Sequence, residues 1–523
     1  MEKDGNLHFF KDFLIFSLVV SNYFVPLHRA YTLYTSYTNE LTMPIPAEIL
    51  AVERPKNTRV KKSGEKYLVI KRTCKRVNGR NVPVELGTIG EIVRGKYVEK
   101  RAAPRTKEIE VKDFGEVALN DKCAGDLLQE LANVWDIADA KRLLVIALLR
   151  SSYGDMRNRD LEMRYQTSFL SEMYPGVSLS ENAVTKFLFD IGAAYSLIVE
   201  FMRNRITAFA GGSMVVDGML KDYNSETGSF SEFSRKAMKK GSRDVSLMYA
   251  FDPLTKEPIA VKPYQGNMLD STAIEDFIEE YDIKRALMIF DKGFHNDSYF
   301  EEAEKREGLS CIIPLKSNSK LIARYGLDEP VEKLNGFNKS TVLYKKERMA
   351  NGKWLYAYRD TRSAFEQETG YIERASKRKG GMDSGKYLEK KGRFGLIVFQ
   401  CKDNLDPLAL YLAYLGRWDI EVMFDMYKNI IDRDTVNVQT DYRLYATELI
   451  NFISVIITTR VRCLLSQTKI GNKKKRPVTE LYSHKQILTY LSKYKKVKTI
   501  EGGKWHPSKR LRYIEELCDA LGI

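Results

Sequence analysis

The sequence predicts an α/β fold with more than one core, in which a mixed sheet is flanked by helices. The chain has 523 residues, several times the ~150 residues typical of one domain, so a single core is not expected. Apolar runs at residues 213–216, 245–251 and 258–264 precede a helical segment and a fourth apolar run at 286–290. The order strand, strand, strand, helix, strand is typical of a mixed sheet with a covering helix.

Composition and charge narrow the classes of protein. Hydrophobic residues make up 44% and charged residues 29% of the chain, as in globular proteins and unlike disordered chains. With 84 basic and 69 acidic residues the formal net charge is +15, which favours a polyanionic partner, nucleic acid first. The 6 cysteines contain no C-x-x-C pair, which argues against a structural zinc site or a disulfide scaffold. The apolar run at 13–20 is shorter than the roughly 20 residues of a membrane span, so no membrane partner is expected.

Three segments are expected ahead of the sheet. Residues 1–42 are interpreted as a translated upstream extension, with Met43 as the true start. Residues 43–110 alternate apolar and basic side chains and predict a basic β-rich module, which either contacts DNA or is an edge sheet with a lysine-rich solvent face. Residues 111–208 have helical periodicity and predict a helical module that could bind DNA. Within it, residues 178–192 are either a core helix or a recognition helix.

The remaining segments alternate between core and accessory structure. Residues 209–316 are expected to form the first part of the central core, and 393–470 its second part. Between them, residues 317–392 break into polar strands and loops, which predicts a β-rich insertion. Residues 471–523 are expected to be a basic tail that ends in a short amphipathic helix.

Acidic residues stand at the ends of two predicted strands. Asp217 follows the first apolar run and Asp291 follows the fourth, 291 − 217 = 74 positions later. The first and fourth strands of such a sheet can lie side by side and parallel, which would bring the two carboxylates together. With Glu421, from a long helix predicted at 407–431, they suit a pair of Mg²⁺ ions, because hard cations prefer oxygen ligands. Without metal, neighbouring carboxylates would repel one another.

The predicted long helix carries a polar stripe. At about 100° per residue, Tyr414, Arg417, Glu421 and Lys428 fall within an arc of about 60°. The neighbouring face is apolar and includes Ile420, Met423, Phe424, Tyr427 and Ile431. Two alternatives remain open: Arg417 and Glu421 form only a solvent-exposed i,i+4 ion pair, or Asp425 is the functional acid.

These motifs resemble a known family. Val215-Val216-Asp217-Gly218, Ile289-Phe290-Asp291-Lys292-Gly293-Phe294 and Tyr414-x2-Arg417-x3-Glu421-x6-Lys428 are similar to the DDE transposases of bacterial insertion sequences that bear the Y-R-E-K signature. The resemblance covers about residues 210–470. It implies a ribonuclease-H-like core with a β-rich insertion between the second aspartate and the glutamate.

The resemblance also implies an activity. As metal ligands and catalytic residues it assigns Asp217, Asp291 and Glu421, and as DNA contacts Tyr414, Arg417 and Lys428. The implied reaction is phosphodiester hydrolysis at transposon ends and transesterification into target DNA, with two Mg²⁺ ions, or Mn²⁺ in their place. The implied partners are terminal inverted repeats, target DNA and a second copy of the chain in the DNA complex, at the nucleoid of a bacterial or archaeal cytoplasm. A ribonuclease-H-like nuclease without strand transfer and an inactive DNA-binding derivative are the alternatives.

Three further positions bear on DNA contact. Related members often have arginine where this chain has Lys292, and threonine or serine where it has Met219. Lys292 remains a candidate DNA contact. Trp354, near the Asn351-Gly352 turn, either packs onto the core or stacks on an unpaired base at the transposon end.

Overall fold

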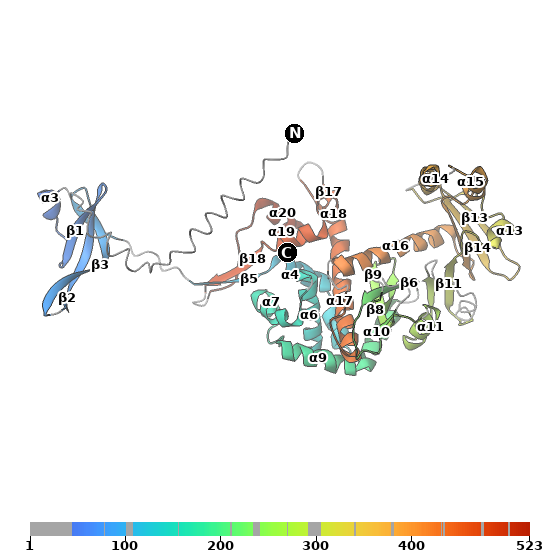
Figure 1. Ribbon diagram of the computed structural model, residues 1–523, viewed down its shortest axis with the longest axis horizontal. Coiled ribbons are helices and arrows are strands. Elements are labelled where there is room, and N and C mark those ends of the chain that lie inside the picture. Colours follow the sequence, from blue (N-terminus) through green and yellow to red (C-terminus); the bar gives the residue numbers. More distant parts are fainter. Residues whose placement is uncertain are drawn as a thin grey trace, which may run out of the picture. The chain divides into compact units, whose positions relative to one another are not determined.

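The structure divides the chain into two compact units. They comprise Met1–Lys107 and Glu108–Ile523. The computed structural model in Figure 1 describes residues 44–77, 79–100, 108–154, 156–209, 212–233, 241–268, 270–290, 305–338, 341–377, 381–429, 431, 435–471, 475–499 and 503–523. The predicted extension at residues 1–42, together with Met43, lies outside this part of the chain.

The first unit is built on a small antiparallel sheet. Its four strands, in spatial order, are β1 (Thr58–Ser63), β2 (Lys66–Val77), β3 (Arg80–Val93) and β4 (Lys96–Glu99), preceded by the short helix α3 (Ala47–Leu50). Val60, Val69 and Ile92 form its small core. The alternation of apolar and basic residues therefore produces a sheet with one narrow buried strip and mostly exposed basic side chains.

A ten-stranded mixed sheet is the centre of the second unit (Figure 1). Its strands are β6 (Ser213–Asp222), β7 (Glu232–Phe233), β8 (Arg243–Asp252), β9 (Glu257–Gln265), β10 (Ala286–Ile289), β11 (Leu309–Pro314), β12 (Glu332–Lys333), β13 (Val342–Arg348), β14 (Trp354–Asp360) and β15 (Leu396–Cys401). The order is β12-β13-β14-β15-β11-β10-β6-β8-β7, and β9 pairs with β8. β10 is parallel to both β6 and β11, whereas the other pairs are antiparallel. The predicted mixed α/β class and the parallel pairing of the first and fourth strands are confirmed.

Helices surround this sheet and form a bundle beside it. They are α4 (Gly115–Ala124), α5 (Leu127–Ala132), α6 (Ile137–Tyr153), α7 (Leu161–Thr167), α8 (Leu170–Met173), α9 (Glu181–Ala193), α10 (Tyr195–Phe209), α11 (Asp270–Glu280), α16 (Pro407–Asn429) and α17 (Asp441–Gln467). The central helix is α17, which packs against α4, α6, α9 and β9. The Ser180 hydroxyl accepts the Ala183 N–H and caps α9, which buries Phe187 and Leu188. Since α9 packs on α17, the face of α9 with Phe187 and Leu188 is part of the core, as the core-helix alternative predicts.

Among the described helices, α17 is long and apolar enough to cross a membrane. Of its most apolar window, 72% is buried inside the protein. The helix is therefore apolar because it is the core of the bundle, where nearly every face meets another element.

The segment predicted as a β-rich insertion contains helices as well. Its hairpin of β13 and β14 extends the central sheet beside β15. It also contains α13 (Lys320–Arg324), α14 (Thr361–Ser376) and α15 (Ser384–Lys391). The β-rich prediction is wrong for these helices. Only Ala364 and Ala375 are buried in α14, and no residue is buried in α15, so these helices are mostly exposed and polar.

The C-terminal segment is folded and is not a tail. Its strand β18 (Lys495–Thr499) pairs with β19 (His506–Pro507) on one side and with β5 (Ile109–Asp113) on the other. The other C-terminal elements are β16 (Lys469–Ile470), β17 (Arg476–Pro477), α18 (Val478–Leu481), α19 (His484–Leu491) and α20 (Arg512–Leu521). Ion pairs between Lys498 and Glu110, at 2.9 Å, and between Lys495 and Asp113 join β18 to β5. The helical prediction for residues 111–208 is thus wrong at its start, because charge complementarity to a distant segment makes these residues a strand.

Candidate active site

Asp217 lies on the central strand of the sheet. In the parallel register Val215 on β6 is the partner of Ile289 on β10, and Asp217 follows Val215 by two residues. The Asp217 carboxylate is half-buried, and its Oδ1 accepts the Gly218 N–H at 2.8 Å. Asp291 and Lys292 lie outside the described residues.

The carboxylate of Asp217 is on the face of the sheet that α16 covers. Asp217 is paired with Tyr249 on β8, and residues directly opposite each other on antiparallel strands project to the same face. The Tyr249 ring lies 5.7 Å from the ring of Phe424, which follows Glu421 on α16 by less than one helical turn. The strand with Asp217 and the helix with Glu421 therefore pack against each other on one side of the sheet.

Arg417 contacts two other residues of the predicted polar stripe on α16. The Arg417 Nη2 lies 3.1 Å from the Glu421 Oε1, and the Arg417 guanidinium carbon lies 5.6 Å from the centroid of the Tyr414 ring. The side chain of Arg417 is only 13% exposed, whereas that of Glu421 is 40% exposed. The ion pair between them exists, but the alternative of a fully solvated pair is wrong for Arg417. Lys428 lies further along the helix and is half-buried.

Packing orients this helix. Its apolar face is buried as predicted, at Ile420, Met423 and Tyr427. A Cβ on Gly416 would lie 2.4 Å from the Pro253 Cβ, so the helix packs tightly against the turn between β8 and β9 beside Arg417. The polar stripe beside this apolar face is partly buried, since the Tyr414 ring lies 4.5 Å from the ring of Phe399 on β15.

Two of the three predicted metal ligands, Asp217 and Glu421, are among the described residues. Within the described residues there is no group of three or more His, Cys, Asp or Glu side chains that could hold a metal ion. The predicted set needs Asp291, which is not among them. Asp217 and Glu421 supply carboxylate oxygens from adjoining elements, a donor type that fits Mg²⁺. Arg417 supplies the positive charge that compensates Glu421.

Trp354 is the first residue of β14, at the edge of the aromatic cluster of the hairpin. Tyr356 and Tyr358, on the same strand face, are 0% and 1% exposed and belong to the core. Trp354 is half-buried, and the Lys346 Nζ lies 4.8 Å from the centroid of its ring. Packing therefore accounts for the two tyrosines, while contact of Trp354 with DNA stays a prediction.

Sequence reasoning missed two features near these residues. Trp418, directly after Arg417, is 65% exposed and lies one helical turn before Glu421. Lys221 on β6 and Glu448 on α17 form a fully buried ion pair. A tryptophan beside the polar stripe, and a lone acid inside an apolar helix, were the signals that could have indicated them.

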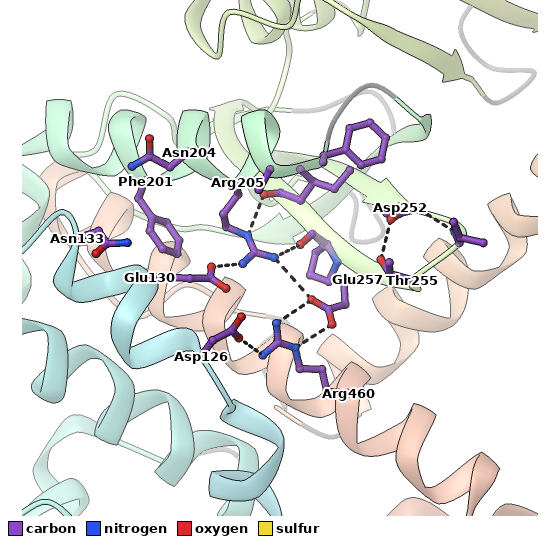
Figure 2. A pocket seen from close by; sticks show the side chains of 15 residues that line it. Asp126, Glu130, Asn133, Phe201, Asn204, Arg205, Asp252, Thr255, Glu257 and Arg460 are labelled. Atoms are coloured by element: carbon purple, nitrogen blue, oxygen red, sulfur yellow. Dashed lines mark hydrogen bonds and ion pairs between the residues drawn. The ribbon is translucent and has the colours of Figure 1, made fainter.

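A cavity of about 800 Å³ lies elsewhere in this unit (Figure 2). The Arg460 Nε lies 2.8 Å from the Glu257 Oε1, and its Nη1 lies 3.1 Å from the Asp126 Oδ1. Arg205 pairs with Glu130 and lies 3.8 Å from Glu257. The described residues that line the cavity include none of the predicted site residues. These ion pairs fasten α17 and α10 to the sheet, so the cavity is a structural junction.

A protein family and a solved structure are similar to this chain. Residues 219–455, a little under half of the chain, match the family described as "Transposase DDE domain". No curated protein matches the sequence at a significant level. Among solved structures, the piggyBac transposase in a synaptic complex with hairpin DNA is similar at 11% identity, with a TM-score of 0.35 over 72% of this chain and 78% of that chain. The family match begins two residues after Asp217 and spans Glu421.

Proposed function

We propose that the protein is a DDE transposase that cleaves DNA at transposon ends and joins the freed 3′ ends to target DNA. Its catalytic carboxylates are Asp217, Asp291 and Glu421, and its cofactor is a pair of Mg²⁺ ions, with Mn²⁺ as a substitute. The proposal includes a ribonuclease-H-like core, and the spatial order β9-β8-β6-β10-β11 supports it.

The packing of β6 against α16 is the observation that supports this proposal most directly. It puts the strand of Asp217 and the helix of Glu421 on the same face of the sheet, within the segment around the family match. Ile289 and Val215 are register partners on β10 and β6. Asp291 follows the first of them by two residues, and Asp217 follows the second by two residues. The spacing in the sequence thus favours Asp291 as the third carboxylate.

In this proposal the protein supplies position and charge. Mg²⁺ bound between the carboxylates would stabilise the attacking and leaving oxygens of the phosphodiester. Asp217 and Glu421 hold oxygen ligands in fixed directions because a strand and a packed helix orient them. Arg417 and Lys428 grip DNA phosphates, the first through its planar guanidinium and the second as a point charge. The hydroxyl of Tyr414 can donate to a phosphate oxygen.

The partners follow from the same proposal. The protein would bind terminal inverted repeats and target DNA, as two copies in the DNA complex, at the nucleoid of a prokaryotic cell. Lys292 and Trp354 are proposed as additional DNA contacts.

The test is a cleavage assay on duplexes that carry the inverted repeats from DNA flanking the gene. Asp217→Asn, Asp291→Asn and Glu421→Gln should each abolish Mg²⁺-dependent cleavage and leave duplex binding intact. Each change removes a ligand charge but almost no volume.

Asp425→Asn is the matched control, because Asp425 lies on the same helix and accepts a hydrogen bond from the Asn429 Nδ2 at 2.6 Å. It should cleave normally. Loss of cleavage in Asp425→Asn with normal cleavage in Glu421→Gln would make Asp425 the functional acid. Cleavage without joining to target DNA would favour a nuclease instead.

A further inference from the structure

We infer that Lys221, Glu448 and Tyr427 form a positioning network that sets the spacing of the Asp217 and Glu421 carboxylates for metal binding. This inference rests on the proposed function. The Lys221 Nζ lies 2.7 Å from the Glu448 Oε1 and donates to the Tyr427 hydroxyl at 2.7 Å. That hydroxyl donates to the Glu448 Oε2 at 2.6 Å. One charged pair and one hydroxyl therefore join β6, α16 and α17 at a single point.

The network is connected to both acids through rigid elements. Side chains alternate along a strand, so Lys221 is on the same face of β6 as Asp217, about 13 Å away along the strand. Tyr427 follows Glu421 on α16 by about 9 Å of helix rise. A shift of α16 along β6 would change the distance between the two carboxylates, and the network opposes that shift.

Further hydrogen bonds fix the network in the bundle. The Asn451 Nδ2 donates to the Tyr427 hydroxyl at 3.0 Å, and the Arg150 Nη1 donates to the Asn451 Oδ1 at 2.8 Å. Glu448, Asn451 and Tyr427 are 1%, 0% and 0% exposed. Asn451 also donates to the Glu448 Oε1 at 3.3 Å, so α6 and α17 hold Glu448 independently of α16.

Burial argues that this pair contributes geometry more than stability. Both side chains of the pair are 1% exposed. Removing two charges from water costs several kcal/mol per ion, so apolar replacements of such pairs are often equally stable. What the replacements lose is direction, because a charged pair with matched hydrogen bonds admits far fewer arrangements than an apolar contact. Metal ligands need that precision. Substitution of residues that support metal ligands commonly lowers metal affinity by about 10- to 100-fold.

The experiment uses the full-length protein with Lys221→Met and Glu448→Gln combined. The Glu448→Gln change keeps a hydrogen-bonding partner for Tyr427 and Asn451, and the paired change leaves no uncompensated buried charge. Mn²⁺ binding is measured by electron paramagnetic resonance of the free ion, with Asp217→Asn as the reference for loss of the site. The double variant should bind Mn²⁺ at least about tenfold more weakly, and its cleavage should need correspondingly more Mg²⁺ while the rate at saturating Mg²⁺ changes little.

Lys112→Met with Glu172→Gln is the matched control. Lys112, 7% exposed, and Glu172, 33% exposed, form an ion pair at 2.6 Å that joins β5 to α8 rather than β6 to α17. It should leave Mn²⁺ affinity at the wild-type value. Unchanged Mn²⁺ affinity in the Lys221 and Glu448 double variant, or a lower maximal rate at an unchanged metal requirement, would overturn the positioning role.

Tyr427→Phe decides the question if the double variant does not fold. It removes only the hydroxyl that bridges Lys221 and Glu448, and it should weaken Mn²⁺ binding in the same direction; wild-type affinity would overturn the inference. Normal cleavage and Mn²⁺ binding by Asp217→Asn and Glu421→Gln would overturn the proposed function and this inference together. Loss in those two variants with wild-type affinity in the network variants would overturn this inference alone.

Discussion

Arg417 has two proposed roles, as the ion-pair partner of Glu421 and as a contact to DNA phosphate. Its guanidinium contacts both the Tyr414 ring and the Glu421 carboxylate, and little of the side chain is exposed. If Arg417 binds a DNA phosphate, as proposed, a guanidinium held in this way would lose less side-chain entropy on binding than a free surface arginine. Lys428, in the last turn of α16, extends the positive charge along the same helix.

Arg417→Ala and Lys428→Ala should each weaken binding of a transposon-end duplex. Each should also lower the slope of log affinity against log salt concentration by about one, because one phosphate contact is lost. Fluorescence anisotropy over a range of salt concentrations measures both quantities. Lys284→Ala is the control, since that side chain is 80% exposed and pairs with Asp282. An unchanged slope in the Arg417 variant would leave it as a structural ion pair.

At the scale of elements, the hairpin of β13 and β14 extends the central sheet and carries its aromatic residues toward α16. Tyr358 packs on Tyr411 of α16, with ring centroids 4.8 Å apart, and its hydroxyl donates to the Pro407 carbonyl at 2.8 Å. The start of the helix with Glu421 is therefore supported by the hairpin. Through this contact, the segment between the second aspartate and the glutamate helps to position the helix that carries Glu421.

Trp354→Ala tests whether the edge of this hairpin contacts DNA. If the ring stacks on an unpaired base, the variant should keep its melting temperature and duplex affinity but accumulate nicked DNA, since stacking is worth roughly 1 to 3 kcal/mol. Tyr356→Ala is the comparison, because truncation of that buried ring should cost about 3 to 5 kcal/mol of unfolding free energy. A lower melting temperature with normal cleavage in the Trp354 variant would mean that its ring only packs.

For the whole molecule, the junction of the N-terminal helices with the C-terminal segment makes stability depend on pH. Glu116 on α4 is 2% exposed, and its Oε2 has no hydrogen-bond partner among the described residues. Burial raises the pKa of Glu116 from 4.5 to about 7. A raised carboxyl pKa means that the folded state holds a proton that the unfolded state has released. The contribution of protonated Glu116 to the free energy of unfolding is therefore fully present below about pH 4.5. It is lost as the pH rises from there to about 7.

Glu116→Gln should remove this part of the pH dependence. Relative to the parent, the variant should gain up to about 3 kcal/mol of unfolding free energy at pH 8 and little at pH 4.5. Urea unfolding at the two pH values measures the difference. A gain in Glu116→Gln that does not vary with pH would contradict the assigned protonation.

The order of the core elements and the stripe on α16 could be predicted from the sequence. Runs such as Val215-Val216 ahead of Asp217, and the spacing of Tyr414, Arg417 and Glu421, are local patterns, and local patterns follow from backbone periodicity alone. The parallel pairing of β6 with β10 could be predicted because few topologies suit that order of strands.

Other features depended on contacts between distant parts of the chain. The pairing of β5 with β18, and the ion pair of Lys221 with Glu448, join residues hundreds of positions apart. Neither Lys-Lys-Val-Lys-Thr at 495–499 nor a single glutamate in an apolar helix has a local pattern that names its partner. Their conformations follow from charge complementarity and burial, which exist only once the chain has folded, because the free energy of a buried charge depends on what surrounds it.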